Sequence, residues 1–154
     1  MNRILPSFRT IRRGVGTQDI KNFIKNHEHG FDGVIKKAKI IKAENGVCIA
    51  EMKVEEEHSN PMGGLHGGLI ATLVDSITSY AIITHKSVQG VPSVSVDIHL
   101  SYLKAAKIGD EILINASTVR TGRTLGFLEC TITNKATGDI IAKGSHTKFL
   151  LRSN

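Results

Sequence analysis

The chain has 154 residues, of which 40% are hydrophobic and 22% charged, and this composition is typical of one globular domain large enough to bury a core. Its formal net charge of +6 either serves solubility or indicates a polyanionic partner. Aromatic residues make up only 5%, tryptophan is absent and no zinc-finger or RNA-recognition motif occurs, so a phosphorylated small molecule fits this charge better than nucleic acid.

The sequence lacks the signals of membrane insertion and of secretion. No apolar run reaches the roughly 18 residues of a membrane span, and no signal peptide with an apolar core and a small-residue cleavage site is found. Cys48 and Cys130 stand singly in strand-like alternations, without a CxxC motif or a Cys/His pair nearby. We therefore expect two buried thiols in a reducing compartment, and no metal site, since His27 and His29 come without further ligands.

Residues 1–18 form a basic segment in which apolar residues separate the arginines and no acidic residue occurs. The arginines are Arg3, Arg9, Arg12 and Arg13, and the apolar residues are Ile4, Leu5, Phe8 and Ile11. This composition resembles a mitochondrial transit peptide and fits a basic amphipathic tail equally well. We therefore divide the chain into this segment and one domain, residues 19–154, and expect a mitochondrial or cytoplasmic protein.

The first predicted helix begins at Thr17, whose hydroxyl is suited to an N-cap, and ends at Gly30. Ile20, Phe23 and Ile24 recur at helical spacing and give this helix one short apolar face.

A β-hairpin is predicted next. From Gly33 the apolar residues recur with a period of two, which predicts a strand over residues 34–43. Glu44-Asn45-Gly46 is a hairpin signal. In the second strand Cys48, Ala50, Met52 and Val54 alternate with Ile49, Glu51 and Lys53. Residues 55–60 form an acidic, polar exit.

Residues 68–84 carry apolar side chains at helical spacing along their whole length, and these predict one long helix. The apolar residues are Leu69, Ile70, Leu73, Val74, Ile77, Tyr80 and Ala81. At 1.5 Å per residue the helix would be about 25 Å long, so a sheet could wrap along all of it. Four glycines at its start, Gly63, Gly64, Gly67 and Gly68, leave backbone N–H groups uncovered, and these can receive an anion or a polarised carbonyl oxygen.

Asp75 lies two turns into this helix, off the apolar stripe, on a side shared with Ala71, Thr72 and Ser79. A carboxylate in so apolar a helix needs either water or a partner. Its position alone fits a solvated or structural residue and a working carboxylate equally well.

Four further strands are predicted after the loop 86–91. In the first of them Val94, Val96, Ile98 and Leu100 form one wholly apolar face. Turns at 109–110, 121–124 and 134–138 separate the remaining strands, which cover residues 112–119, 125–133 and 140–150.

The predicted order is two strands, one long helix and four strands. Turns of a few residues between consecutive strands imply antiparallel pairing. The chain is therefore an α+β domain in which one curved antiparallel sheet wraps around one central helix. A single curved sheet leaves an edge strand, and self-association would cover it.

The sequence HGGLIATLVD, together with this order of elements, resembles proteins of the hotdog fold. The chain is similar to the hotdog acyl-CoA thioesterases of the thioesterase-superfamily-member-two type, within the phenylacetate-type thioesterase family. The resemblance covers residues 33–147 and is strongest in 51–58, 65–75, 94–97 and 134–138. It implies hydrolysis of acyl-CoA in a homodimer, with two dimers forming a tetramer.

The resemblance also implies catalytic roles. The Gly67 N–H and the Asn60 side chain would stabilise the oxyanion that forms from the thioester carbonyl. His66 would lie beside the thioester sulfur. Asp75 would act as general base or as direct nucleophile, and Ser95 would position the water.

Coenzyme A would bind at residues that the resemblance places along its site. They are Glu56, Tyr102, Leu103, Lys104, Ala105, Ala106, Lys107, Arg120, Thr121, Gly122, Arg123, Thr124 and Leu125. Four of these residues are cations at two turns that a curved sheet could bring together around the phosphates. We expect no separate cofactor, since coenzyme A is part of the substrate.

The leading interpretation is a thioesterase acting on medium- to long-chain fatty acyl-CoA or on aromatic acyl-CoA. A hotdog hydratase acting on enoyl thioesters and a non-catalytic module that binds acyl-CoA are the alternatives. A Ser-His-Asp hydrolase is disfavoured because no GxSxG motif occurs. The sequence GGLHGG lacks the Gly-Lys-Ser/Thr of a phosphate-binding loop, so the phosphates must be held elsewhere.

Overall fold

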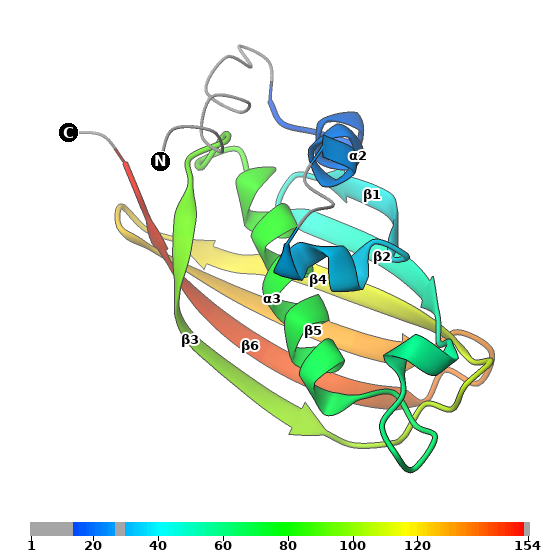
Figure 1. The fold of residues 1–154 in the computed structure, drawn as a ribbon. Helices are drawn as coiled ribbons and strands as arrows, with labels where there is room; N and C mark the ends of the chain where they lie inside the picture. Colours follow the sequence, from blue (N-terminus) through cyan, green and yellow to red (C-terminus); the bar gives the residue numbers. More distant parts are fainter. Residues whose placement is uncertain (1–13, 27–29, 153–154) are drawn as a thin grey trace.

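A computed structural model describes residues 14–26 and 30–152 of the chain. One six-stranded antiparallel sheet, ordered β1-β2-β4-β5-β6-β3, curves around helix α3 (Figure 1). The helix spans Gly67–Ile83, and the strands span Lys39–Glu44 (β1), Val47–Lys53 (β2), Ser93–Tyr102 (β3), Glu111–Thr121 (β4), Leu125–Asn134 (β5) and Ile140–Leu150 (β6). The predicted α+β architecture is therefore confirmed.

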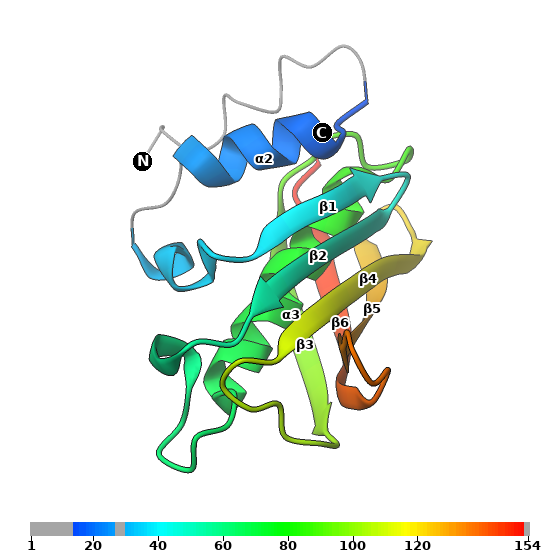
Figure 2. The same cartoon turned by 90° about the vertical axis from the view of Figure 1, so that its right-hand side faces the viewer.

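The core lies between α3 and the concave side of the sheet, along which the helix runs in Figure 2. On the helix side the buried residues are Ile70, Leu73, Val74, Ile77, Thr78, Ala81 and Ile82. Leu69 and Tyr80, which we expected on the buried stripe, are only partly covered. Thr78 is buried in spite of its hydroxyl, because that hydroxyl bonds the Val74 carbonyl oxygen at 2.7 Å.

The strands bury alternate residues as their period predicts. Cys48, Ala50 and Met52 of β2 face the core, as do alternate residues of β4 and β5. Cys48 and Cys130 are free and buried, and burial raises the pKa of each thiol to about 12.

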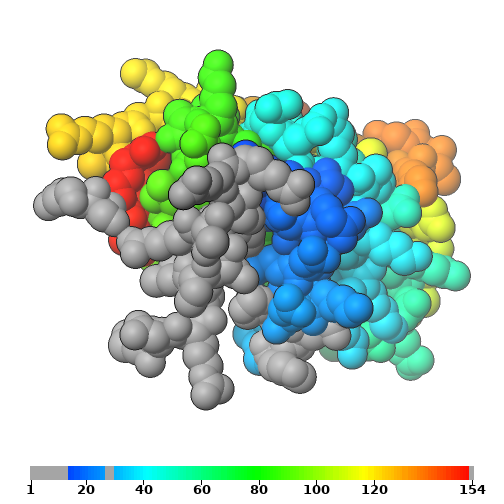
Figure 3. All heavy atoms as spheres, turned by 90° about the horizontal axis from the view of Figure 1, so that it is seen from above, coloured from blue at the N-terminus to red at the C-terminus, as the bar shows by residue number. Residues whose placement is uncertain are grey.

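The predicted first helix is confirmed as α2, Thr17–Asn26, which packs on β1 (Figure 3). Ile20 is fully buried, and the Thr17 hydroxyl accepts from the Ala43 N–H at 2.9 Å. The first two residues of α2, Thr17 and Gln18, belong to the segment defined as residues 1–18. Most of the basic segment, residues 1–13, and the predictions for His27 and His29 lie outside the described residues.

The strand predicted over residues 34–43 begins only at Lys39. Before it, Phe31–Ile35 forms a short 3-10 helix, η1, after Gly30, whose φ of +84° lies in the left-handed region. Ile35 and Ala38 are both buried, and this spacing of three belongs to a helical turn. The hairpin at Asn45-Gly46 is confirmed, since both residues have the positive φ that a tight hairpin turn requires.

Strand β3 differs from the prediction of one wholly apolar face. Its pairing with β6 shifts between Ser95 and Asp97, which marks a β-bulge. Val94 and Val96 are consequently 50% and 60% exposed, while Ile98 and Leu100 pack on the core. The bulge therefore turns Ser95 toward α3, and β3 is one edge of the described sheet.

Candidate active site

The start of α3 presents one free backbone donor. His66 caps the helix: its Nδ1 accepts from the Gly68 N–H at 2.9 Å, and its carbonyl oxygen accepts from the N–H groups of Leu69 and Ile70. Among the described residues, none accepts a hydrogen bond from the Gly67 N–H. This group lies at the positive end of the helix dipole and is suited to an oxyanion.

Asn60 supplies a second donor on the loop before α3. Its Oδ1 accepts from the N–H groups of Met62 and Gly64, at 2.9 and 3.2 Å, and these two bonds fix the orientation of the amide. The Nδ2 atom has no acceptor within the described part of the chain, and it lies close to Gly64. The two donors predicted from the sequence are thus both present and unused.

A second polar cluster surrounds Asp75 in the middle of α3. The Ser95 hydroxyl donates to Asp75 Oδ1 at 3.2 Å, and His146 Nε2 lies 3.0 Å from Ser95 Oγ. At its other end, His146 Nδ1 lies 2.6 Å from Thr78 Oγ1. Burial, reinforced by the nearby Lys148 cation, lowers the pKa of His146 to about 4. The ring is therefore neutral at pH 7. Because Ser95 donates to Asp75, the ring proton lies on Nε2 and is donated to Ser95 Oγ, while Nδ1 accepts from the Thr78 hydroxyl, whose proton is shared with the Val74 carbonyl oxygen.

Lys148 completes this cluster. Its Nζ donates to Ser79 Oγ at 2.7 Å and lies 3.8 Å from Asp75 Oδ1, which forms an ion pair. The side chain is only 4% exposed, and burial lowers the pKa of this lysine. A cleft of about 350 Å³ opens onto Asp75, Ser79, Ser95 and Lys148, so a water molecule can reach the carboxylate.

His146 and Lys148 were not among the predicted site residues. A signal was present, because both residues follow Ala142 on the alternating side of β6 that faces the core. Charged or titratable residues at such positions indicate a functional site more often than surface charges do. The pairing of β6 with β3 then places Lys148 opposite Ser95 and His146 opposite Ile98.

The two clusters do not meet within one chain. Asp75 follows Gly67 by eight residues, which corresponds to about 12 Å along α3. No hydrogen bond or ion pair among the described residues joins the cluster of Asn60, His66 and Gly67 to that of Asp75 and Ser95.

The first segment predicted to bind coenzyme A, residues 102–107, lies beside the helix start. The Tyr102 hydroxyl donates to the Gly67 carbonyl oxygen at 3.2 Å, and the Leu65 N–H donates to the Ala106 carbonyl oxygen at 2.8 Å. Lys104 is exposed and pairs with Asp139 at 2.6 Å. Glu56, in the short 3-10 helix η2 (Glu56–His58), is exposed.

The second predicted segment, residues 120–125, lies at the opposite end of α3. Thr121 Oγ1 is 2.5 Å from Ser87 Oγ, just beyond the end of the helix. Strand β4 separates this turn from Lys107 by about 35 Å, since it extends over 11 residues. The expectation that the curved sheet would bring the four cations together is therefore wrong for a single chain.

Among the described residues, no group of three His, Cys, Asp or Glu side chains could hold a metal ion. None of the helices in this part of the chain is long and apolar enough to cross a membrane.

Comparison with known proteins gives a family match and close relatives. The family model described as thioesterase superfamily matches residues 62–141. The chain is 46% identical over 136 residues to acyl-coenzyme A thioesterase 13 of Homo sapiens, and this match covers 87% of the chain and 96% of the human protein.

Two solved structures of thioesterases have folds similar to that of this chain. Zebra fish thioesterase superfamily member 2 superposes with a TM-score of 0.84 at 45% identity, covering 88% of the chain and 99% of the zebra fish chain. A hypothetical thioesterase of Streptococcus pneumoniae, solved with coenzyme A, gives a TM-score of 0.72 at 29% identity and covers 79% of the chain and 91% of its own.

Proposed function

The chain belongs to the thioesterase superfamily, and from this premise we propose that it hydrolyses acyl-coenzyme A to the free acid and coenzyme A. The family resemblance and the hotdog fold drawn from the sequence are thereby confirmed. The observation that carries the proposal is the combination of an unused N–H at the start of α3 with a carboxylate that holds a serine hydroxyl.

The Gly67 N–H and Asn60 Nδ2 bind the thioester carbonyl oxygen in the proposed site. The Asn60 amide is held by two backbone N–H groups and the Gly67 N–H is held by helix α3, so little reorganisation is needed when negative charge develops on that oxygen. Loss of one such donor lowers the rate by roughly 10²–10³.

Asp75 activates water in the proposed mechanism. It takes a proton from a water molecule held by Ser95, the water oxygen bonds to the carbonyl carbon, and the C–S bond breaks as the proton passes to the departing thiolate. In the alternative mechanism the Asp75 carboxylate attacks the carbonyl carbon, the C–S bond breaks and the thiolate of coenzyme A leaves, and water then hydrolyses the resulting mixed anhydride.

His66 assists the departing thiolate. Because Nδ1 accepts the Gly68 N–H, the neutral ring carries its proton on Nε2. That N–H is a donor for the sulfur as its negative charge develops.

The site is shared between two copies of the chain. A carbonyl bound at Gly67 is about 12 Å along the helix from Asp75 of the same chain, so the carboxylate must come from a partner related by two-fold symmetry. The edge strand β3, with Val94 and Val96 exposed, offers a surface for this pairing. Phe127 and Phe149, exposed on the outer side of the sheet, support association of two dimers into a tetramer.

Coenzyme A lies across the same interface. Lys104 and Lys107 lie near the helix start, and a partner with an antiparallel helix would bring its Arg120 and Arg123 to that end. Four cations would then meet the phosphates, which one chain alone does not achieve.

Residues 1–18 direct the protein to mitochondria in this proposal, because their arginines occur without carboxylates. A fluorescent reporter fused after residue 18 should enter mitochondria. A diffuse cytosolic signal would assign the segment as a basic tail.

Thiol release tests the proposed activity directly. Mixing the protein with palmitoyl-CoA and a thiol reagent should release free coenzyme A in proportion to enzyme and time. A change confined to the absorbance of an enoyl-CoA substrate would indicate a hydratase, and binding without either change would indicate a binding module.

A further inference from the structure

The excess positive charge of the chain lies entirely in its first 44 residues. Residues 1–44 contain ten lysines and arginines against four aspartates and glutamates, a surplus of six that equals the net charge of the whole chain. The other 110 residues contain ten of each kind and are neutral overall, although they include the four cations assigned to coenzyme A. A charge excess confined to one part of a chain indicates an anionic partner for that part, either a membrane surface or a nucleic acid.

Helix α2, η1 and strand β1, which come from this stretch, form one basic layer on the outside of the domain. The Thr17 hydroxyl bonds both the carbonyl oxygen and the N–H of Ala43, at 3.2 and 2.9 Å, and so holds the start of α2 against the end of β1. Figure 2 shows α2 running along β1, with η1 beneath one end of the helix. The exposed lysines of the basic layer are Lys21, Lys25, Lys36, Lys39 and Lys42.

The charge of these five lysines is largely uncompensated. Among the described residues, Lys42 is the one of the five that forms an ion pair, with Glu44 at 2.8 Å. The other exposed carboxylate described in this stretch is Asp32. The basic layer therefore presents a positive surface to solvent, and the field of such a surface attracts an extended anionic partner.

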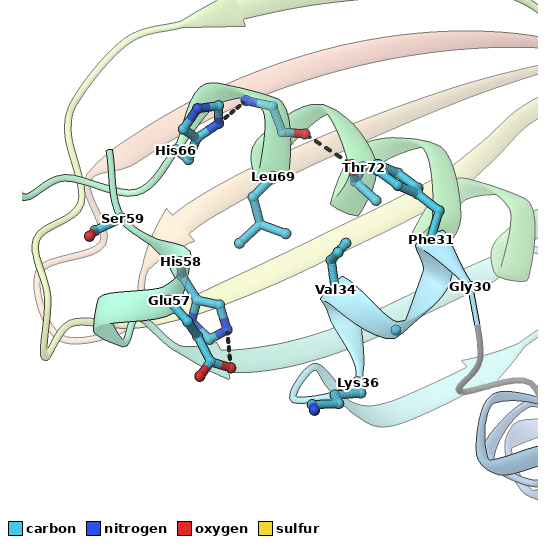
Figure 4. Close-up of a pocket in the computed structure, with 12 residues that line it drawn as sticks. Gly30, Phe31, Val34, Lys36, Glu57, His58, Ser59, His66, Leu69 and Thr72 are labelled. Carbon is cyan, nitrogen blue, oxygen red and sulfur yellow. Dashed lines mark hydrogen bonds and ion pairs between the residues drawn. The ribbon is translucent and has the colours of Figure 1, made fainter. Parts of the chain in front are cut away.

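Exposed apolar side chains alternate with these lysines along the chain. Ile41 is 49% exposed in the bulge of the edge strand β1, and Phe31 and Val34 of η1 are 74% and 44% exposed. Figure 4 shows Phe31 and Val34 beside the first turns of α3, where they border a cavity of about 740 Å³. Cations combined with large exposed apolar side chains are typical of surfaces that lie on a lipid bilayer, whereas a nucleic acid backbone has no apolar interior to receive them.

We propose that the basic layer docks the domain on an anionic phospholipid bilayer. The lysines lie at the level of the lipid phosphates, and Phe31 and Ile41 enter the boundary between headgroups and acyl chains. Four arginines precede α2 in the sequence and add to the same charge. This docking does not depend on the proposed catalytic activity.

Sedimentation of the full chain with lipid vesicles tests the proposal. The protein should bind vesicles of phosphatidylcholine mixed with phosphatidylglycerol, should not bind vesicles of phosphatidylcholine alone, and should be released as salt rises. Lys21→Gln/Lys25→Gln should weaken binding to the mixed vesicles by at least about tenfold, because each cation near an anionic bilayer contributes about fivefold. Ile41→Ser should weaken binding by at least about threefold while keeping the salt dependence.

Lys86→Gln/Lys143→Gln is the matched control, since it removes the same charge from exposed positions outside the basic layer. It should bind the mixed vesicles within about twofold of the wild type. Thiol release without vesicles should be unchanged in Lys21→Gln/Lys25→Gln, because neither lysine belongs to the proposed active site.

The proposal is overturned if the wild type does not sediment with the mixed vesicles, or if it binds both kinds of vesicle equally. Equal binding by Lys21→Gln/Lys25→Gln and the wild type, or an equal loss in the control, would also contradict it. Preference for single-stranded RNA over the mixed vesicles would assign the basic layer to nucleic acid instead. Sedimentation requires no catalysis, so failure of the proposed function would appear separately, as an absence of thiol release.

Discussion

Two polar side chains beside Asp75 occupy positions that face the core. His146 is 1% exposed and Lys148 is 3% exposed. Both are tolerated because each has polar partners on α3, namely Thr78 for His146 and Ser79 for Lys148. A buried cation reduces stability compared with an apolar side chain, so its presence next to a carboxylate supports a functional role.

Lys148→Met should raise the stability of the protein and lower its activity. The variant replaces a buried ammonium group by an apolar side chain, and the Asp75 side chain that remains is 47% exposed and can be hydrated. We expect the free energy of unfolding to rise by about 1 kcal/mol. The value of kcat should fall by roughly tenfold or more, because Asp75 and Ser95 lose the cation that holds them.

Urea unfolding and thiol release measure these two effects on the same preparation. Lys143→Met is the matched control, since Lys143 is exposed on the same strand and should change neither quantity. A Lys148→Met variant with lower stability and unchanged kcat would contradict a catalytic contribution from this lysine.

His146 should make stability depend on pH. Burial lowers its pKa to about 4 from the ordinary 6.5, so the unfolded chain binds more protons than the folded chain between these values. The contribution of His146 to stability is therefore present above pH 6.5 and is lost as the pH falls toward 4. Between pH 7 and pH 5 this loss amounts to about 2 kcal/mol.

Comparison with His146→Asn isolates this effect, because other titrating groups are common to both proteins. The wild type should be more stable than the variant at pH 7, and the difference should shrink by about 2 kcal/mol at pH 5 in urea unfolding. A difference that stays constant or widens on acidification would show that the ring is protonated in the folded state.

Among the elements, β5 and β6 carry glycines where side chains of α3 come closest to their backbones, Gly126 beside Ile82 and Gly144 beside Val74. A Cβ on Gly144 would lie 2.8 Å from Val74 Cγ1 and 2.9 Å from Leu100 Cδ2. Gly144→Ala should therefore lower the free energy of unfolding by about 1–3 kcal/mol through overpacking.

Chemical denaturation of Gly144→Ala and of a control variant tests this contact. Gly122→Ala is suitable, because its Cβ would meet nothing closer than the Leu125 carbonyl oxygen at 3.5 Å. The control should unfold within about 0.5 kcal/mol of the wild type. Equal stability of all three proteins would mean that α3 does not pack tightly on β6.

The elements with one buried face were predictable from periodicity. The alternation of β2 and the helical stripe of α3 each reflect a single packed side, and Asn45-Gly46 specifies its turn by backbone conformation alone. The 3-10 helix η1 was missed because its five residues are too few to establish a period. The bulge in β3 was missed because it depends on the pairing with β6, a strand distant in the sequence.

The candidate site was assigned from the family resemblance. The motif HGGLIATLVD contains His66, Gly67 and Asp75, Asn60 was added from the same resemblance, and the catalytic roles of all four stay predictions. His146 reaches Ser95 only through the β3–β6 pairing, and local sequence does not specify which distant strands pair. The distance between the cations predicted to bind coenzyme A depends on the length of β4, and their meeting in the proposed site depends on a second copy of the chain.

In the whole molecule, we propose that one active site needs two chains. Asn60 and Gly67 belong to the helix start, while Asp75 and Ser95 form a separate cluster about 12 Å along the same helix. Pairing through a two-fold axis would place the donors of one copy opposite the carboxylate of the other. Each dimer would then hold two equivalent sites.

Mixed refolding of two inactive variants tests this claim most directly. Asp75→Asn and Asn60→Ala should each be nearly inactive alone, whereas half of the randomly formed dimers would combine the two chains, and each mixed dimer would contain one intact site and one doubly damaged site. Thiol release should therefore recover to about 25% of the wild-type rate after the variants are unfolded and refolded together. Activity that stays at the average of the two separate variants would place all the catalytic groups within one chain and contradict the shared site.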